Sequence, residues 1–289
     1  MTMDTSQYRA GAEAIMAALA VDSPPTGGIP PIQAGRRWQW LHGRGELDLF
    51  VKDVRASDRS DIDDRLAVLS CGAELHRMIV ELAAAGWTAA VTRQPYRAFP
   101  FHLATVRITP RPAVHESAPR QPPRPDQPGE QARPGGADNL WALSSAIERA
   151  GGELTLLSAA QVPDLLAVTI RGDRPADVAS SRRPLPPAEN GGPPEQHAVF
   201  AILHGRDDRP SSWLHAGEAF GAGCLAAADR KVSIQPLTDA IRDADAREKI
   251  RRVVPGEGFP YLILRVSSPA STSPAGSGAP PTSRRHSGR

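Results

Sequence analysis

The distribution of proline constrains the fold of this 289-residue chain more than any other feature of its sequence. Of its 29 prolines, 22 fall in four short stretches, at 24–31, 110–134, 175–194 and 269–281. Proline has no backbone N–H and is excluded from helix interiors and from central strands. Regular secondary structure must therefore lie between these stretches, and the sequence predicts a globular protein interrupted by proline-rich linkers.

The proline-rich stretches also set the expected domain boundaries, because a chain of this length supports one large domain or two small ones. The final segment is rich in Ser, Pro and Gly, and such a composition buries too little apolar surface to fold. Its basic end suggests a docking segment as one hypothesis. We expect a first half at 6–109, a linker at 110–136, a second half at 137–266 with a proline-rich loop at 175–194, and a disordered tail at 267–289.

Charge and cysteine content exclude several classes of protein. The chain has 34 Lys and Arg against 32 Asp and Glu, so its net charge of +2 gives no electrostatic basis for binding nucleic acid. Cys71 and Cys224 exclude a disulfide-rich scaffold, and their apolar contexts predict buried, inert thiols. The sequence shows no signal pattern, no metal-ligand spacing and no apolar run near the roughly 20 residues of a membrane span. We therefore expect a cytoplasmic protein without membrane, metal or nucleic-acid partners.

Hydrophobic periodicity predicts the order α–β–β–α–β–β for the first half. Leu47, Leu49 and Val51 alternate with Asp48, Phe50 and Lys52, which is the period-2 pattern of a half-buried strand. Gly72 lies within the longest helical pattern, where glycine costs about 1 kcal/mol, so it marks either a helix boundary or a close backbone approach. The expected helices cover residues 6–20 and 61–85, and the expected strands cover 38–41, 46–52, 87–93 and 102–109.

The second half also alternates predicted helices and strands, and part of its sequence weakly resembles the first half. The run from Cys71 to His76 resembles the run from His215 to Phe220, and each lies in a helix followed by a strand. Two unrelated helix–strand units would explain this echo equally well. The expected helices cover 139–150, 213–228 (capped by Ser211 or Ser212) and 244–254; the expected strands cover 153–158, 197–204, 232–237 and 261–266; and 164–171 fits either type.

Several segments that occur in matching order resemble a known family. They are Leu69–His76 with Leu82–Trp87 in the first half, and Trp213–Glu218, Leu225–Ala228, Gln235–Leu237 and Phe259–Arg265 in the second. Over about residues 10–109 and 137–267 the sequence resembles the Acg family of actinobacterial, dormancy-associated, nitroreductase-like proteins. The resemblance implies an α+β, nitroreductase-like fold made as a single-chain pseudo-dimer of two fused halves, and hence a monomer.

The same resemblance implies a flavoprotein oxidoreductase. Nitroreductases hold FMN between two subunits and pass a hydride from NAD(P)H to a nitro or quinone substrate. Arg36 and Arg37 either supply charge for the flavin phosphate or form a solvated pair, and Trp38 either packs in the core or lines the cleft. Gln235–Pro236–Leu237–Thr238 falls where family members place backbone near the flavin. The cofactor-binding candidates are therefore Arg36, Arg37, Trp38, Gln235, Leu237 and Thr238.

Departures from the family pattern imply weakened or lost catalysis, as in a degenerate member. Where the family has Asn, Gln and Pro before its two tryptophans, this chain has Ala34, Arg36 and Arg37. Alanine cannot replace the donor and acceptor of an amide. The proline-rich stretches 110–134 and 175–194 occupy the places of the family's arginine motif and lid. The alternative is a non-catalytic protein that binds or sequesters flavin, or regulates, on the same scaffold.

No residue is assigned a catalytic role. The sequence shows no Ser/His/Asp or Cys/His constellation, so any chemistry would belong to the cofactor. We expect packing or surface roles for His76 and His215. The glycines at 217, 221 and 223 lack the order of a phosphate loop and predict close helix–helix contact, and Asp207–Asp208 is expected to cap the following helix.

Overall fold

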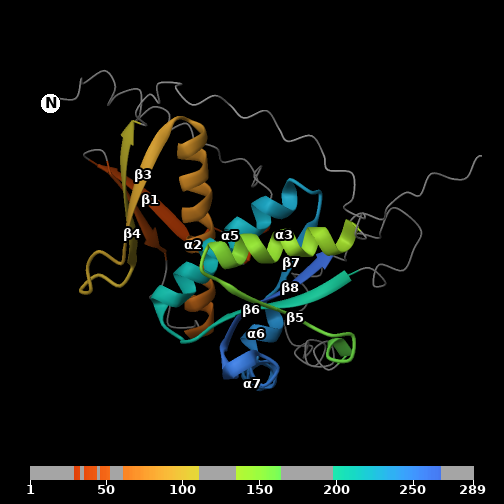
Figure 1. The fold of residues 1–289 in the computed structure, drawn as a ribbon. Helices are drawn as coiled ribbons and strands as arrows, with labels where there is room; N and C mark the ends of the chain where they lie inside the picture. Colours follow the sequence, from red (N-terminus) through yellow and green to blue (C-terminus); the bar gives the residue numbers. More distant parts are fainter. Residues whose placement is uncertain are drawn as a thin grey trace, which may run out of the picture.

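The computed structural model describes residues 29–32, 36–43, 46–52, 61–110, 135–163 and 198–267 (Figure 1). The helix expected at 6–20 and the ambiguous segment at 164–171 lie outside these residues, as do most of the expected linkers and tail. Helices and antiparallel sheets make up the described part, which agrees with the predicted α+β class. None of its helices is both long and apolar enough to cross a membrane.

The first half contains one antiparallel sheet, sheet A, and one long helix. Sheet A has the strand order β1-β2-β4-β3, and α2 covers the face that carries the alternating buried residues of β2. The bounds of these elements agree with the predicted ranges to within two residues. Their bounds are β1 Trp38–Gly43, β2 Glu46–Val51, α2 Asp61–Ala84, β3 Trp87–Arg93 and β4 His102–Pro110.

The second half contains a second antiparallel sheet, sheet B, with the order β5-β6-β8-β7. Counted along each half, the four strands of sheet B have the same spatial order as those of sheet A. Helices α3 and α5 pack together, and the short helices α6 and α7 pack against β8. The bounds are α3 Gly135–Arg149, β5 Glu153–Leu156, β6 Ala198–Gly205, α5 Pro210–Ala228, β7 Ser233–Leu237, α6 Asp239–Arg242, α7 Ala244–Arg251, a 3-10 turn Pro255–Glu257 and β8 Phe259–Ser267.

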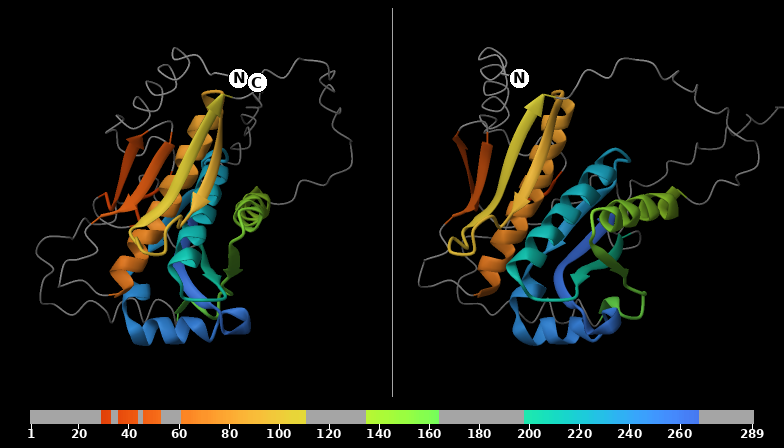
Figure 2. Two further views of the ribbon diagram at one scale, coloured as in Figure 1. Left: turned by 90° about the vertical axis from the view of Figure 1, so that its left-hand side faces the viewer. Right: turned by 60° about the vertical axis from the view of Figure 1, so that its left-hand side comes forward.

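The layers follow one another as sheet A, α2, α5 and sheet B (Figure 2). Helix α2 is buried between sheet A and α5, and α5 is buried between α2, α3 and sheet B. We call the α2–α5 contact the seam. Because both helices are covered on several sides, their sequences are rich in Ala, Gly and Leu rather than strongly amphipathic.

Two glycines set the spacing of the seam. A Cβ built on Gly72 would lie 2.1 Å from the carbonyl oxygen of Leu214, and one built on Gly217 would lie 2.0 Å from that of Leu69. No side chain fits at such distances. Helix α2 continues through Gly72, so of the two interpretations of this residue, close backbone approach is confirmed and a helix boundary is wrong. The close contacts expected of the α5 glycines are likewise confirmed, since Gly221 meets α2 and Gly223 meets α3.

Several predicted element ends are wrong. Helix α5 begins at Pro210 with Arg209 at the N-cap position, so neither Ser211 nor Ser212 caps it. The hydroxyl of Ser212 instead donates a hydrogen bond to Asp207. The helix expected at 244–254 ends at Arg251, and the strand expected at 153–158 ends at Leu156. The four-residue helix α6 was not predicted, because one turn is too short to show a period.

Candidate functional site

Arg37 lies directly before edge strand β1 and next to α2. Its carbonyl oxygen accepts a hydrogen bond from the backbone N–H of Lys52 at 2.8 Å, and the thiol of Cys71 lies 3.9 Å from the same oxygen. The Nε atom of the Arg37 guanidinium is buried and has no hydrogen-bond partner among the residues that the structure describes. A buried N–H on a charged group without a partner costs free energy. An anionic ligand would supply the missing acceptor.

Arg36 and Trp38 adjoin this position. The guanidinium carbon of Arg36 lies 5.8 Å from the centroid of the Trp38 ring, which is the range of a cation–π contact. Trp38 and Trp40 pair with Val51 and Leu49, whose side chains face α2, and both rings pack against the core. The structure therefore favours core packing for both tryptophans, with Trp38 also offering its ring to Arg36.

The second group of predicted residues lies at the end of β7, an edge strand of sheet B. Gln235 pairs with Arg265, and Leu237 pairs with Ile263, both in β8. Thr238 precedes α6; its carbonyl accepts the N–H of Ile241, while its hydroxyl makes no capping bond. All three residues are half-buried. The six predicted residues thus form two groups, at edge strands of two different sheets.

A bidentate ion pair that the sequence analysis did not predict joins β3 of the first half to α5 of the second. Arg93, at the end of β3, donates from Nε to Oε1 of Glu218 at 2.7 Å and from Nη2 to Oε2 at 2.5 Å. Glu218 is buried within α5, and the side chain of Arg93 is 35% exposed. His76 of α2 lies close by; burial lowers its pKa, and the charge of Glu218 opposes this effect. A lone carboxylate in an otherwise apolar helix was the available sequence signal.

Other ion pairs and hydrogen bonds hold the same layers together. Arg65 of α2 lies 2.9 Å from Asp208, and Asp208 also accepts the indole N–H of Trp213 at 2.8 Å. Asp207 accepts from Arg209 and Ser212, and these bonds lower its pKa to about 2. The predicted N-cap role of Asp207–Asp208 is therefore wrong, because Arg209 occupies the N-cap position and the two carboxylates mainly bind side chains at the start of α5.

Glu74 is a second buried carboxylate, on α2. It accepts the indole N–H of Trp40 at 3.1 Å, and the guanidinium of Arg77 at 2.8 and 2.6 Å. The bonds to Glu74 are the largest cause of a raised pKa for Arg77. This network fixes the first strand of sheet A to its covering helix.

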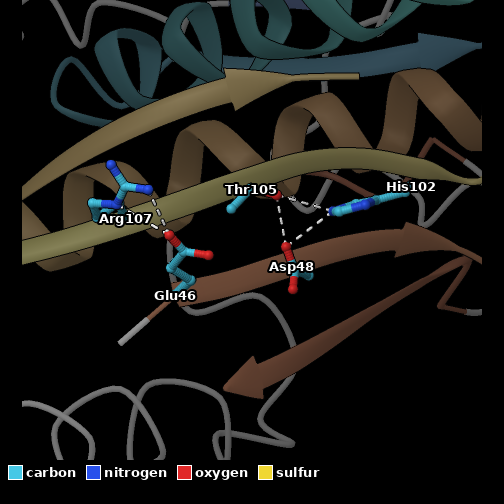
Figure 3. Close-up of polar contacts among 5 residues, drawn as sticks. All are labelled: Glu46, Asp48, His102, Thr105 and Arg107. Atoms are coloured by element: carbon cyan, nitrogen blue, oxygen red, sulfur yellow. Dashed lines mark hydrogen bonds and ion pairs between the residues drawn. The ribbon is translucent and has the colours of Figure 1, made fainter. Parts of the chain in front are cut away.

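The outer face of sheet A carries a hydrogen-bonded cluster of Asp48, His102 and Thr105 (Figure 3). Asp48 Oδ1 lies 3.0 Å from His102 Nε2 and accepts the hydroxyl of Thr105 at 2.7 Å, and that hydroxyl lies 3.1 Å from the same Nε2. A β-bulge brings them together. One residue along β2, from Leu49 to Phe50, corresponds to two along β4, from Ala104 to His102, so His102 emerges on the outer face.

This cluster does not have the geometry of a nucleophilic triad. In a Ser–His–Asp triad the carboxylate and the hydroxyl bond to opposite ring nitrogens, whereas here both share Nε2 of His102. The ring also stacks on Phe50, with centroids 4.5 Å apart, and contacts Tyr96 at 5.7 Å. The exposed pair of Glu46 and Arg107 flanks it on the same two strands. The arrangement stabilises sheet A and offers no activated nucleophile.

Sheet B has its own buried histidine, His204 on β6. The hydroxyl of Thr155 lies 2.9 Å from its Nε2. Its Nδ1 is buried and lacks a hydrogen-bond partner within the described part of the chain, and Oε2 of Glu153 lies 3.6 Å away. Burial lowers the pKa of His204, opposed by the charge of Glu153. One ring nitrogen is therefore occupied and the other is not.

Cys71 and Cys224 are free, buried thiols on α2 and α5. Burial raises the pKa of both, so neither carries a reactive thiolate at neutral pH. This confirms the prediction of buried, inert cysteines. Any chemistry at the seam has to come from other groups.

Comparison with known proteins yields relatives rather than a family model, since no family model matches the chain. The "Putative NAD(P)H nitroreductase Rv3131" of Mycobacterium tuberculosis is 28% identical over 301 aligned positions, which cover 89% of this chain and 86% of the relative. The "Uncharacterized protein Rv3127" of the same organism is 25% identical, over 89% of this chain and 87% of its own length. The "Putative NAD(P)H nitroreductase acg" is 36% identical over 87 residues, 30% of this chain and 26% of that protein.

Proposed function

This chain is similar over most of its length to a protein named as an NAD(P)H nitroreductase, and over 30% of its length to Acg. From that premise we propose that it is an FMN-binding, NAD(P)H-linked oxidoreductase of weakened or lost catalytic activity. The observation that supports this most is the similarity over 89% of the chain to a protein named as an NAD(P)H nitroreductase. Both halves of the fold take part in it. The substrate class would be a nitro compound or a quinone.

We further propose that the chain is a monomeric pseudo-dimer. Sheets A and B have the same strand order, and Gly72 and Gly217 face each other across the seam, each against the carbonyl three residues before the other. Two fused copies of one ancestral unit would produce such matched positions. An internal seam also takes the place that a subunit interface has in a dimeric nitroreductase.

The residues at the start of β1 suit the phosphate of FMN. Arg37 has a buried Nε that lacks an acceptor among the described residues, and Arg36 presents a second, exposed guanidinium beside Trp38. Guanidinium groups match phosphate in both charge and geometry. Gln235, Leu237 and Thr238 form the second group, at an edge strand of the other sheet, where the resemblance implies backbone near the flavin. Bound FMN would supply the hydride chemistry, while these side chains would hold and orient it.

The alternative is a protein that binds or sequesters flavin without turnover. It is favoured by Ala34, which offers no amide where the family pattern has Asn, and by Arg36 and Arg37 in place of Gln and Pro. Two arginines strengthen the binding of an anion but do not restore the amide contacts to a flavin ring. Binding and turnover therefore separate the two functions.

The test begins with the visible absorbance of the purified full-length chain, before and after addition of FMN and gel filtration. We expect retained flavin, and about tenfold or greater weakening of FMN binding in Arg37→Gln, because a charged hydrogen bond contributes about 1.5–3 kcal/mol. Arg107→Gln is the matched control, since that arginine is 71% exposed on the outer face of sheet A. Absence of retained flavin would overturn both functions.

Turnover is then measured as NADH or NADPH oxidation with a nitro compound or a quinone as acceptor. Flavin-dependent oxidation that falls in Arg37→Gln and not in Arg107→Gln supports the enzyme. Retained flavin without oxidation under any of these conditions supports the sequestering or regulatory protein.

A further inference from the structure

We propose that His204 and Glu153 on sheet B form a binding site for a divalent transition-metal ion of the Zn²⁺ type. His204 Nδ1 and a Glu153 carboxylate oxygen would be the protein ligands, and water would complete the coordination. No group of three or more His, Cys, Asp or Glu side chains suited to a metal lies within the described residues, so this is an open, two-ligand site. The site is separate from the flavin residues at β1 and β7.

The register of sheet B places both ligands on one face. Glu153 of β5 lies directly opposite His204 of β6, and directly opposed residues have Cβ atoms about 4.5–5.5 Å apart. Thr155, two residues along β5, therefore shares that face. Because β5 and β6 are hydrogen-bonded neighbours, the sheet itself fixes the distance between the two ligand groups.

The distance between the ligand atoms suits one shared ion. Nδ1 of His204 lies 3.6 Å from Oε2 of Glu153, too far for a good hydrogen bond. Zinc binds imidazole nitrogen and carboxylate oxygen at about 2.0–2.2 Å, so two ligands at a near-tetrahedral angle lie about 3.4 Å apart. The observed separation therefore needs little adjustment to bridge through a metal ion.

The ring of His204 is prepared as a ligand in two respects. His204 is 5% exposed, and its Nδ1 finds no hydrogen-bond partner in the part of the chain that the structure describes. Its Nε2 lies 2.9 Å from Thr155 Oγ1; when Nε2–H donates to this oxygen, the lone pair is on Nδ1. A bond from the second ring nitrogen is the usual support for a metal-binding histidine.

Solvent reaches this pair from the side of Glu153, while Gly258 packs closely against the ring of His204. A Cβ on Gly258 would lie 3.3 Å from Nδ1 and 3.0 Å from the carbonyl oxygen of Gly205, although the backbone of Gly258 has φ −60° and ψ 161°, which any residue adopts. A side chain here would press on His204 and on the neighbouring Val254. Glu153 is 49% exposed, so an ion can reach it from solvent, and the neighbouring cation, Arg206, lies 3.6 Å from the other oxygen, Oε1.

The probe is Zn²⁺ alone, added to the full-length chain labelled with ¹⁵N-histidine and followed by NMR of the ring nitrogens. We expect a saturable shift of the Nδ1 resonance of His204, assigned by its absence in His204→Gln. Ring nitrogens report each histidine separately, so binding by any of the other seven does not interfere. FMN is not needed, and the outcome is independent of the proposed flavin function.

Glu153→Gln tests the second ligand without altering a buried group. We expect about 10- to 100-fold weaker Zn²⁺ binding at His204, the range found when groups around a metal are altered. Glu148→Gln, an exposed carboxylate on α3 that bonds Ser144, is the matched control and should bind as the wild type does. Should His204→Gln fail to fold, the site is identified by a saturable ring-nitrogen shift that weakens in Glu153→Gln and is retained in Glu148→Gln. The proposal is overturned if Zn²⁺ at millimolar concentration leaves His204 Nδ1 unshifted, or if Glu153→Gln binds unchanged.

Discussion

Sheet A and sheet B have the same strand order, and each contains one buried histidine beside a bulge, but the two rings are used differently. Each bulge inserts an extra residue in the last strand of its half, Leu103 in β4 and Tyr261 in β8. His102 pairs with Phe50 at the first bulge, and His204 pairs with Pro260 at the second. The histidines therefore occupy opposite strands of equivalent pairs.

The difference lies in how many polar partners each ring has. Nε2 of His102 is held by both Asp48 and Thr105, while Nδ1 of His204 has, among the described residues, only a carboxylate beyond hydrogen-bonding distance. A satisfied buried network stabilises one arrangement, whereas a buried polar atom without a partner costs free energy. One scaffold thus carries a hydrogen-bonded cluster on sheet A and, on sheet B, a histidine with one ring nitrogen that lacks a partner among the described residues.

The largest effect should come from the seam that both halves share. In Gly72→Ala the new methyl group would overlap the backbone of α5 and force the helices apart, so we expect destabilisation of about 3 kcal/mol or more. Gly217→Ala should cost a similar amount, because the contact is reciprocal. Urea unfolding followed by circular dichroism measures both. Gly43→Ala, with no atom near its Cβ position, is the control, and equal stability of all three variants would contradict the role of the seam.

The second largest loss of stability should follow from breaking the ion pair between β3 and α5. Glu218→Gln keeps the shape of the side chain but leaves Arg93 without its anionic partner, so we expect a loss of about 1–3 kcal/mol. Glu46→Gln breaks an exposed pair on sheet A and should cost less than about 1 kcal/mol. Chemical denaturation at low and moderate salt compares them. If the two losses matched, the Arg93–Glu218 pair would be no more than a surface contact.

Much of this fold follows from local patterns in the sequence. The alternation of Leu47, Leu49 and Val51 and the long apolar helix of α2 depend on neighbours within a few residues, so β2 and α2 could be predicted. Gly72 could be recognised as unusual, but its partner Gly217 lies 145 residues further along the chain. Reading one helix alone leaves two explanations open, and only the packed pair selects between them.

The polar sites were much harder to predict. Strict alternation along β4 places His102 on the same face as Ala104 and Val106, and nothing in the sequence marks Leu103 as the extra residue that reverses it. Arg93 and Glu218 are 125 residues apart, and their pairing depends on how the two halves pack. The resemblance to a family drew attention to Arg36 and Arg37, but burial of the Arg37 Nε is a property of the folded chain.

The third largest loss of stability should come from the histidine cluster of sheet A, compared with that of sheet B. Asp48→Asn keeps an oxygen acceptor but removes the charge that strengthens its bonds to His102 and Thr105, and we expect a loss of about 1–2 kcal/mol. Glu153→Gln should change stability by no more than about 0.5 kcal/mol, because this half-exposed carboxylate makes no hydrogen bond to His204. Urea titrations at pH 7 without added metal measure both. Equal losses would show that the sheets use their histidines alike.

The smallest expected effect is a pH dependence located in sheet B. Burial lowers the pKa of folded His204 below its unfolded value near 6.5, so the unfolded chain binds a proton that the folded chain does not, and stability falls as the pH drops below about 6.5. Glu153 opposes this shift, so Glu153→Gln should lower the folded pKa further and steepen the acid loss. Unfolding free energies at several pH values between 7 and 5 measure the slope, with Glu148→Gln as the control. A slope in Glu153→Gln no steeper than in that control would mean that the Glu153 carboxylate does not act on the His204 ring. The lowered pKa of His204 would then come from burial alone.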